Sequence, residues 1–198
     1  MAQERHGSSA CVTGLSVLIA LGANAPFRGE PPDTTLRHAL AALAEEGAAP
    51  QAVSRFYRTP AFPPGAGPEF VNAAASLAWA GGPAEILALL HRVERRFGRE
   101  RPVRWGPRTL DLDLLAFGDA VLPDRATFEA WAALPADRQR REAPEELILP
   151  HPRLHERPFV LIPLADIAPD WRHPVFGRSV SEMVASLPAQ MRSDVTPL

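Results

Sequence analysis

The spacing of hydrophobic residues predicts strands and helices that alternate along most of the chain. Continuous or alternating apolar runs, which are typical of strands, occur at 16–21, 53–57, 70–78 and 110–117, with shorter extended pieces at 147–149 and 159–164. Apolar residues at helical spacing occur at 33–47, 83–97 and 180–187, with a shorter helix expected at 128–134. Because the strands return through short hairpin-like connections, we expect an α+β layered domain in place of a parallel doubly wound sheet.

Turn-forming residues set the expected ends of the two longest helices. Asp33 is expected to cap the first helix and Gly47 to end it. Pro83 is expected to open the second helix and Gly98 to end it. The stretch 59–68 is too rich in proline and glycine for regular structure, so we expect a loop there.

The length of 198 residues suits one domain with a single core. We expect residues 1–15 to be a disordered extension and 16–198 to form the domain, with a charged insertion at about 119–146. Cys11 is the one cysteine, so no internal disulfide can form, and a reducing compartment is indicated. No apolar run reaches the roughly 20 residues that a membrane helix needs.

The N-terminal region has some features of a signal peptide. Residues 10–21 are largely apolar, and the Ala-Asn-Ala of 23–25 has the small-residue pattern of a cleavage site. Arg5 is offset by Glu4, however, and Thr13 with other small residues interrupts the apolar stretch. We therefore expect a cytoplasmic protein.

The charged residues exclude several kinds of chemistry. The net charge of −2 gives no bulk field that would attract nucleic acid or an anionic membrane. All 21 basic residues are arginines, and lysine is absent. Schiff-base chemistry, a Walker P-loop and the strand lysine of a protein kinase are therefore excluded. Any phosphate that this protein binds must be bound by arginine.

The Asp111-Leu112-Asp113 segment is the first candidate for chemistry. Side chains two apart on a strand share a face, with Cα atoms about 6.5 to 7 Å apart. Two like charges on one face repel, and hard divalent cations bound through oxygen relieve the repulsion. Two magnesium ions can share such a pair during phosphoryl transfer. The alternative is the solvated face of an ordinary strand, and a D-x-D alone does not decide between them.

An arginine-rich segment precedes these carboxylates. Between residues 92 and 108 the chain holds seven arginines, whose planar forks match phosphate oxygens. Arg92, Arg95 and Arg96 fit a solvated helix face with Glu94 as counter-charge. The later ones, Arg99, Arg101 and Arg108, lie in an irregular segment that leads into the carboxylates. Gly98 and Gly106 could let this segment close as a cationic lid.

Two aromatic residues are candidates for a stacking slot around a flat heterocycle. Phe70 precedes Asn72, whose amide can both donate and accept hydrogen bonds, and Phe159 follows a segment rich in histidine and arginine. For each phenylalanine alone, core packing is the competing interpretation. His151 is a candidate hydrogen-bond donor to a phosphate group, although a single histidine is more often structural.

Four blocks of the sequence together resemble the 6-hydroxymethyl-7,8-dihydropterin pyrophosphokinase family of folate biosynthesis. They are 19–24, 54–60 running on to 70–74, 104–113 and 149–157, and their order and spacing cover nearly all of residues 16–188. The resemblance implies a ferredoxin-like αβα layered sandwich with a mainly antiparallel central sheet. It also implies magnesium-dependent transfer of the β,γ-diphosphate of ATP to the pterin hydroxymethyl oxygen, with release of AMP.

The resemblance implies roles for residues on the phosphate side. Asp111 and Asp113 match the ligands of two magnesium ions, Arg99 and Arg108 match the arginines that clamp the transferring group, and His151 matches a histidine that meets the phosphates. The remaining positions that match nucleotide contacts are His91, Glu94, Arg101, Leu114, Ile148 and Arg157. His91 and Ile148 depart from the family pattern, which has glutamine and threonine at these positions. The departure bears on the adenine and ribose contacts that the resemblance implies, and not on the chemistry.

On the pterin side the resemblance implies a sandwich between Phe70 and Phe159. Asn72 matches a hydrogen-bonding partner of the pterin edge, and Trp105 matches a lid residue. The backbone around Thr59, Pro60 and Phe62 matches the rest of that edge. The insertion at 119–146 is longer than in compact relatives.

Two other functions remain open on the sequence. A glycosyltransferase could use a D-x-D pair to bind a metal and a nucleotide sugar, but no segment has the pattern of a parallel nucleotide-binding half. A pterin- or nucleotide-binding module without turnover is the other alternative, and the intact pair with Arg108 argues against it. We expect a monomer, with a weak dimer as the alternative.

Overall fold

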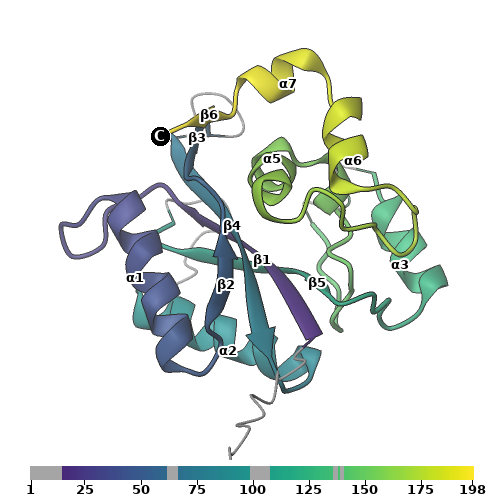
Figure 1. Cartoon of the computed structure of the whole chain (residues 1–198), viewed down its shortest axis with the longest axis horizontal. Coiled ribbons are helices and arrows are strands. Elements are labelled where there is room, and N and C mark those ends of the chain that lie inside the picture. Colours follow the sequence, from purple (N-terminus) through teal and green to yellow (C-terminus); the bar gives the residue numbers. More distant parts are fainter. Residues whose placement is uncertain (1–14, 62–66, 99–107, 136–137, 139–140) are drawn as a thin grey trace, which may run out of the picture.

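The computed structural model describes residues 15–61, 67–98, 108–135, 138 and 141–198. Its centre is an antiparallel sheet in the order β5-β1-β4-β3-β6, with β2 also paired to β4 (Figure 1). The strands are β1 (Leu15–Ala23), β2 (Pro50–Val53), β3 (Tyr57–Thr59), β4 (Phe70–Trp79), β5 (Asp111–Phe117) and β6 (Thr196–Pro197). The predicted α+β class and antiparallel sheet are therefore confirmed.

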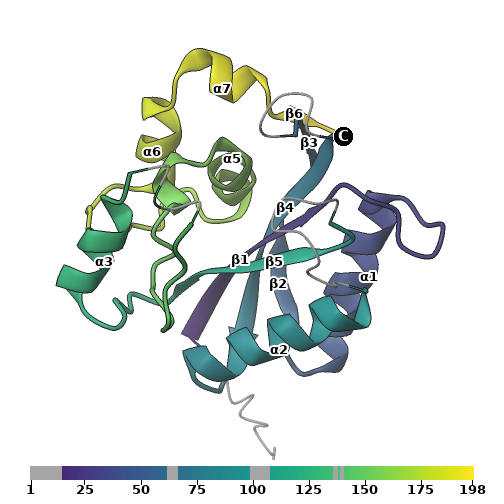
Figure 2. The same cartoon turned by 180° about the vertical axis from the view of Figure 1, so that it is seen from behind.

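Helices cover both faces of this sheet. Figures 1 and 2 show α1 (Pro32–Glu45) and α2 (Pro83–Arg96) on one side, and α5 (Pro158–Ile167) with α6 (Val180–Ser186) on the other. The smaller elements are α3 (Arg125–Ala132), the 3-10 turn η1 (Leu154–Glu156) and α7 (Ala189–Ser193). None of the helices in the described part of the chain is long and apolar enough to cross a membrane.

The central strand β1 is buried on both faces, which explains its continuous apolar sequence. Val17, Ile19 and Leu21 pack in the cluster formed with α1 and α2. Leu18 and Ala20 point the other way, into the cluster formed with α5 and α6. Since side chains alternate along a strand, a strand between two helical layers needs apolar residues at every position.

The predicted helix at 83–97 is also confirmed. Ile86, Leu89 and Leu90 are fully buried on its inner face. The Glu85 side chain accepts a hydrogen bond from the Gly82 backbone N–H at 2.6 Å, which caps the first turn. Gly98 follows the helix with φ of +72°, a conformation that favours glycine.

The structure corrects the predicted strand at 53–57. β2 ends at Val53 and β3 begins at Tyr57. Between them, the Ser54 backbone N–H still donates to the Ala74 carbonyl at 2.9 Å, but the Ala74 N–H donates to the Ser54 hydroxyl at 2.9 Å and not to a main-chain carbonyl. The next residue, Arg55, turns toward α5.

The predicted extended piece at 159–164 is wrong, because these residues belong to the helix α5. A short run that is apolar throughout does not distinguish a buried strand from a buried helix. Pro158 at the first helical position favours the helix. Val160, Leu161 and Leu164 then share its buried face.

Smaller differences concern helix ends. The residue that caps α1 is Pro31, and Asp33 lies inside the first turn. The helix expected at 128–134 begins earlier, at Arg125, because the Asp124 side chain accepts a hydrogen bond from the Thr127 N–H at 2.9 Å. The extended piece at 147–149 is only an isolated bridge at Leu149, and α7 and β6 were not predicted.

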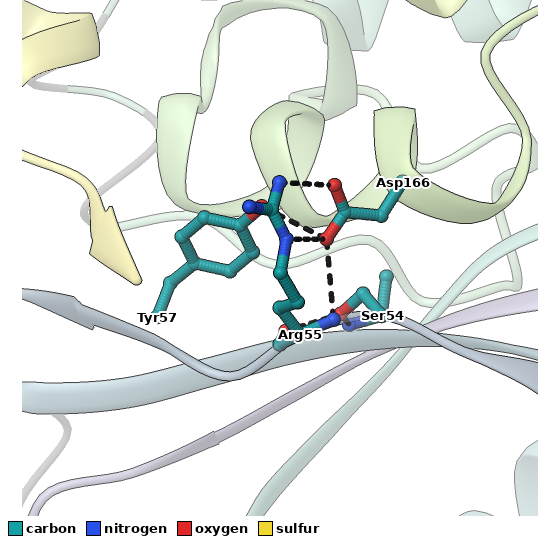
Figure 3. Close-up of polar contacts among 5 residues, drawn as sticks. Ser54, Arg55, Tyr57 and Asp166 are labelled. Carbon is teal, nitrogen blue, oxygen red and sulfur yellow. Dashed lines mark hydrogen bonds and ion pairs between the residues drawn. The ribbon is translucent and has the colours of Figure 1, made fainter. Parts of the chain in front are cut away.

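A polar cluster fixes α5 to the β2–β3 connection (Figure 3). Asp166, near the end of α5, accepts hydrogen bonds from the Arg55 side chain at 2.7 and 3.0 Å and from its backbone N–H at 3.1 Å. It also accepts one from the Tyr57 hydroxyl at 2.8 Å. The cluster therefore holds the helix that carries Phe159 at its start.

Candidate active site

The strand register brings the two predicted halves of the site to one face of the sheet. Gly22 on β1 pairs with Asp111 on one side and with Asn72 on the other. Two residues earlier, Ala20 pairs with Asp113 on the β5 side. Paired residues project to the same face. The two carboxylates and the Asn72 amide therefore lie on either side of β1. The small residues Ala20 and Gly22 of β1 lie between them and are called the floor of the site.

The two carboxylates have the orientation that the sequence predicts. Leu110, Leu112 and Leu114 are buried in the core toward α1 and α2. Asp111 and Asp113 therefore point to the opposite face, where their side chains are 15% and 36% exposed. A surface of this kind can present two carboxylates to a ligand without exposing the core.

Each carboxylate lies beside an arginine. The Arg108 guanidinium donates to Asp111 in an ion pair. Arg157 comes from the turn before α5, and its Nη1 lies 3.6 Å from Oδ2 of Asp113. Its guanidinium also lies over the Phe159 ring, 5.7 Å from the centroid. The predicted carboxylates, two of the predicted arginines and one predicted aromatic residue therefore form one contiguous group.

His151 is held beside β5 in one defined tautomer. Its backbone N–H donates to the Leu115 carbonyl at 2.8 Å, and its ring Nδ1 accepts a hydrogen bond from the Arg153 backbone N–H at 3.1 Å. With Nδ1 accepting, the neutral ring carries its proton on Nε2, which can donate to a phosphate oxygen. Burial, followed by the nearby charge of Arg157, lowers the pKa of His151, so the ring is neutral at pH 7.

The residues predicted for the pterin side lie across β1 from the carboxylates. Asn72 is 6% exposed, and its amide nitrogen donates to the Thr59 hydroxyl at 2.7 Å. A Cβ on Gly22 would lie 3.0 Å from the Asn72 Oδ1 and 4.0 Å from the Phe70 ring. The amide oxygen and the ring therefore both lie over Gly22. Pro60 follows Thr59 on the surface, and Phe159 is 36% exposed.

The predicted nucleotide contacts have more varied positions. Glu94 on α2 is 3% exposed, and its side chain accepts a hydrogen bond from the Leu112 N–H at 2.8 Å, between the two aspartates. His91 is half-buried on the same helix. The side chains of Leu114 and Ile148 are buried, which leaves mainly their backbone groups for contact with a ligand.

Four predicted site residues lie outside the described part of the chain. They are Phe62, Arg99, Arg101 and Trp105. Their predicted roles stay predictions.

The donor set fits hard divalent cations that are shared with a substrate. Within the described residues, no group of three or more His, Cys, Asp or Glu side chains could bind a metal ion by itself. Asp111 and Asp113 supply carboxylate oxygens only. Magnesium keeps several waters and is commonly bound by one or two carboxylates together with phosphate oxygens. This pair therefore suits a metal that arrives with a polyphosphate.

Gly22 and Asn24 were not among the predicted site residues, although both belong to the first of the four sequence blocks. Gly22 supplies the centre of the floor, where a side chain would meet Asn72. Asn24 is 6% exposed and contacts both halves of the site. A glycine and an asparagine that directly follow an apolar strand are the signal that could have identified them.

The sequence of this chain is similar to sequences of known proteins. Residues 18–169 match the family model described as 7,8-dihydro-6-hydroxymethylpterin-pyrophosphokinase (HPPK). A Bacillus subtilis protein named 2-amino-4-hydroxy-6-hydroxymethyldihydropteridine pyrophosphokinase is 39% identical over 150 residues, which are 75% of each chain. Proteins of the same name from Pseudomonas aeruginosa and Synechocystis sp. are 40% and 39% identical, and the match spans 72% and 66% of their lengths.

Solved structures show the same fold. A Plasmodium falciparum HPPK-DHPS structure matches 91% of this chain with a TM-score of 0.63 and 13% sequence identity. The match covers 46% of the Plasmodium chain, so this protein spans less than half of it. At this identity the likeness concerns the fold alone.

Proposed function

Because this chain belongs to the 7,8-dihydro-6-hydroxymethylpterin-pyrophosphokinase family, we propose that it transfers the β,γ-diphosphate of ATP to the hydroxymethyl group of 6-hydroxymethyl-7,8-dihydropterin. The products are AMP and the pterin diphosphate, an intermediate of folate biosynthesis. The observation that carries the proposal is the row Asp111–Gly22–Asn72 across three strands. It supports the proposal because Asp111 and Asn72 are separated by a single strand and project to the same face of the sheet.

Asp111 and Asp113 would hold two magnesium ions that also bind the triphosphate. When bound, the metals neutralise charge on the phosphate oxygens that develops as the bond to the α-phosphate breaks. The two carboxylates provide the fixed platform, since they share one face of β5 and the backbone N–H between them is bonded to the buried Glu94. The side chains Arg108 and Arg157 already flank the pair.

Arg108, Arg157 and His151 are proposed to bind the phosphate chain. Guanidinium groups donate in pairs to phosphate oxygens, and a neutral imidazole adds one further donor from Nε2. The proposal is supported by the ion pairs of Arg108 and Arg157 with the two carboxylates and by the effect of the Arg157 charge on the pKa of His151. Arg99 and Arg101 are proposed to add to this group on the basis of the sequence.

The pterin is proposed to lie over Gly22 between Phe70 and Phe159. With its nitrogen bonded to Thr59, Asn72 presents its amide oxygen as an acceptor for ring N–H or amino groups. The backbone of Thr59, Pro60 and Phe62 and the indole of Trp105 complete this half in the proposal. No residue among those described is placed as a general base. Positioning of the hydroxymethyl oxygen against the β-phosphorus then supplies most of the rate enhancement.

The direct test is formation of AMP from ATP, with and without 6-hydroxymethyl-7,8-dihydropterin and magnesium. We expect AMP only when all three are present. AMP without pterin would indicate a hydrolase, and no AMP in the complete mixture would leave a binding module. Turnover of UDP-sugars would favour the glycosyltransferase interpretation. We further propose a cytoplasmic monomer, to be checked by cell fractionation and by light scattering.

An Asp113→Asn variant tests the metal platform. The substitution keeps the shape of the side chain and removes its negative charge, so magnesium-dependent turnover should fall by about 10²-fold or more. Asp119→Asn is the matched control, because Asp119 is an exposed carboxylate just beyond β5. Near-normal turnover of a folded Asp113→Asn variant would remove the platform from the mechanism.

An Arg108→Ala variant tests the assignment to the transferring group. It should lower kcat far more than it weakens pterin binding, because the charge that Arg108 would meet develops in the transition state. Equal losses in kcat and in pterin affinity would reassign Arg108 to ground-state binding.

A further inference from the structure

The end of strand β1 contacts both halves of the site. Asn24 is the first residue after β1, and its side chain is almost fully buried. Its Oδ1 accepts a hydrogen bond from the Arg108 backbone N–H at 2.8 Å. Its amide nitrogen donates to the Pro68 carbonyl at 3.3 Å. One side chain thus joins segments that lie 84 and 44 residues away in the sequence.

Both partners of Asn24 lead directly to residues of the proposed site. Arg108 carries the guanidinium that pairs with Asp111. Pro68 precedes Phe70, the first residue of β4, by two positions. Backbone bonds strengthen the first connection, since the N–H groups of Asn24 and Ala25 donate to the Arg108 carbonyl at 2.9 and 3.1 Å. The main chain of Arg108 is therefore held on both its N–H and its carbonyl.

The chemistry of these contacts requires an amide. One partner is a donor and the other an acceptor, so the side chain must accept at one atom and donate at the other. An aspartate at this position could still accept from Arg108, but its second oxygen would face the Pro68 carbonyl without a proton to share. An alanine would lose both contacts and leave two backbone groups without this partner.

We propose that Asn24 is a positioning residue that sets the phosphate-side arginine and the pterin-side aromatic residue at the same time. It acts through the main chain of Arg108 and Pro68, and not by contact with the reacting groups. This inference rests on the proposed function, whose two halves it links. It predicts that a single amide substitution changes kcat and the pterin KM together, although these depend on different segments.

Two variants separate the contacts. Asn24→Ala should lower kcat by about 10-fold or more and also raise the pterin KM, because small misplacements of a clamping group are costly. Asn24→Asp keeps the acceptor for Arg108 and loses the donor for Pro68. It should therefore raise the pterin KM while retaining more of kcat than Asn24→Ala does.

Ser181→Ala is the matched control, because it removes a side-chain hydrogen bond to another proline carbonyl, that of Pro169, at 3.1 Å. Kinetics are measured for all variants at least 15 °C below each melting temperature, so that the folded fraction is equal. The proposal would be overturned if kcat and the pterin KM of Asn24→Ala were both within about twofold of the values for Ser181→Ala. So would Asn24→Asp with the same loss of kcat as Asn24→Ala.

The wild-type protein in the same assay separates this inference from the proposed function. If the wild type turns over and the Asn24 variants have the same kcat and pterin KM as the wild type, only the role of Asn24 is contradicted. Absence of wild-type turnover contradicts the proposed function itself. Binding of the pterin in the presence of magnesium and a non-hydrolysable ATP analogue gives a second readout, in which Asn24→Asp should weaken pterin binding more than nucleotide binding. Equal weakening of both would contradict the separate roles of the two contacts.

Discussion

Replacement of Asp166 by alanine should destabilise the protein chiefly through Tyr57. The Asp166 carboxylate accepts the hydrogen bond from the Tyr57 hydroxyl at 2.8 Å, and Tyr57 is only 2% exposed (Figure 3). Removal of the carboxylate leaves that hydroxyl buried without this partner, which costs about 1–3 kcal/mol. The pair with Arg55 adds little to stability, because that guanidinium is largely in solvent.

A loss of about 2 kcal/mol corresponds to a fall in melting temperature of about 4–8 °C for a chain of this size. The assay is urea unfolding of wild type, Asp166→Ala, Tyr57→Phe and the double variant. In the Tyr57→Phe background there is no buried hydroxyl to lose its partner, so Asp166→Ala should lower the free energy of unfolding much less there. Equal costs in both backgrounds would refute the reasoning, since they would show that the carboxylate acts independently of Tyr57.

The same cluster predicts a dependence on pH. Burial alone would raise the pKa of Asp166, but the hydrogen bonds from Arg55 and Tyr57 outweigh it and lower that pKa below the usual value. A lowered carboxyl pKa means that the contribution is fully present above the unfolded-state pKa near 4. It is then lost as the pH falls through the folded-state pKa. Asp166→Ala should therefore flatten the acid limb of the stability curve.

Three further predictions concern other parts of the molecule. Burial, then the neighbouring His155, lowers the pKa of His173 to about 4, so His173 should cost about 3 kcal/mol of stability as the pH falls from 6.5 to 4. Urea unfolding against pH should show a flatter profile for His173→Phe, and an unchanged slope would contradict this. Ser179→Ala should cost about 1 kcal/mol in the same assay, because the Ser179 hydroxyl caps α6 by accepting from the Glu182 N–H at 3.1 Å; a change under 0.3 kcal/mol would argue against the cap. Removal of magnesium with EDTA should abolish AMP formation without changing the melting temperature of the ligand-free protein, because two carboxylates alone form no structural metal site.

Several elements could be predicted because their determinants are local. The continuous apolar run of β1 and the 3.6-residue spacing in α2 indicate burial on two faces and on one face respectively. The orientation of Asp111 and Asp113 follows from the two-residue period of a strand, with no knowledge of its neighbours. The absence of lysine likewise leaves arginine as the only permanently cationic side chain that could bind phosphate.

Other features depend on partners that lie far away in the sequence. Residues 159–164 form a helix because their apolar side chains fill the second core cluster against β1 and β4, and the run itself fits either structure. The break between β2 and β3 depends on Ser54 meeting Ala74 and on Arg55 meeting Asp166.

The assembly of the site belongs to this second group. The sequence by itself determined which side chains could bind metal, phosphate and a flat ring. Only the tertiary structure decided that Gly22 would stand between Asp111 and Asn72, and that Asn24 would join the segments on either side. The physical reason is that strand order and register are set by the packing of whole layers, to which every strand contributes and which no single segment encodes.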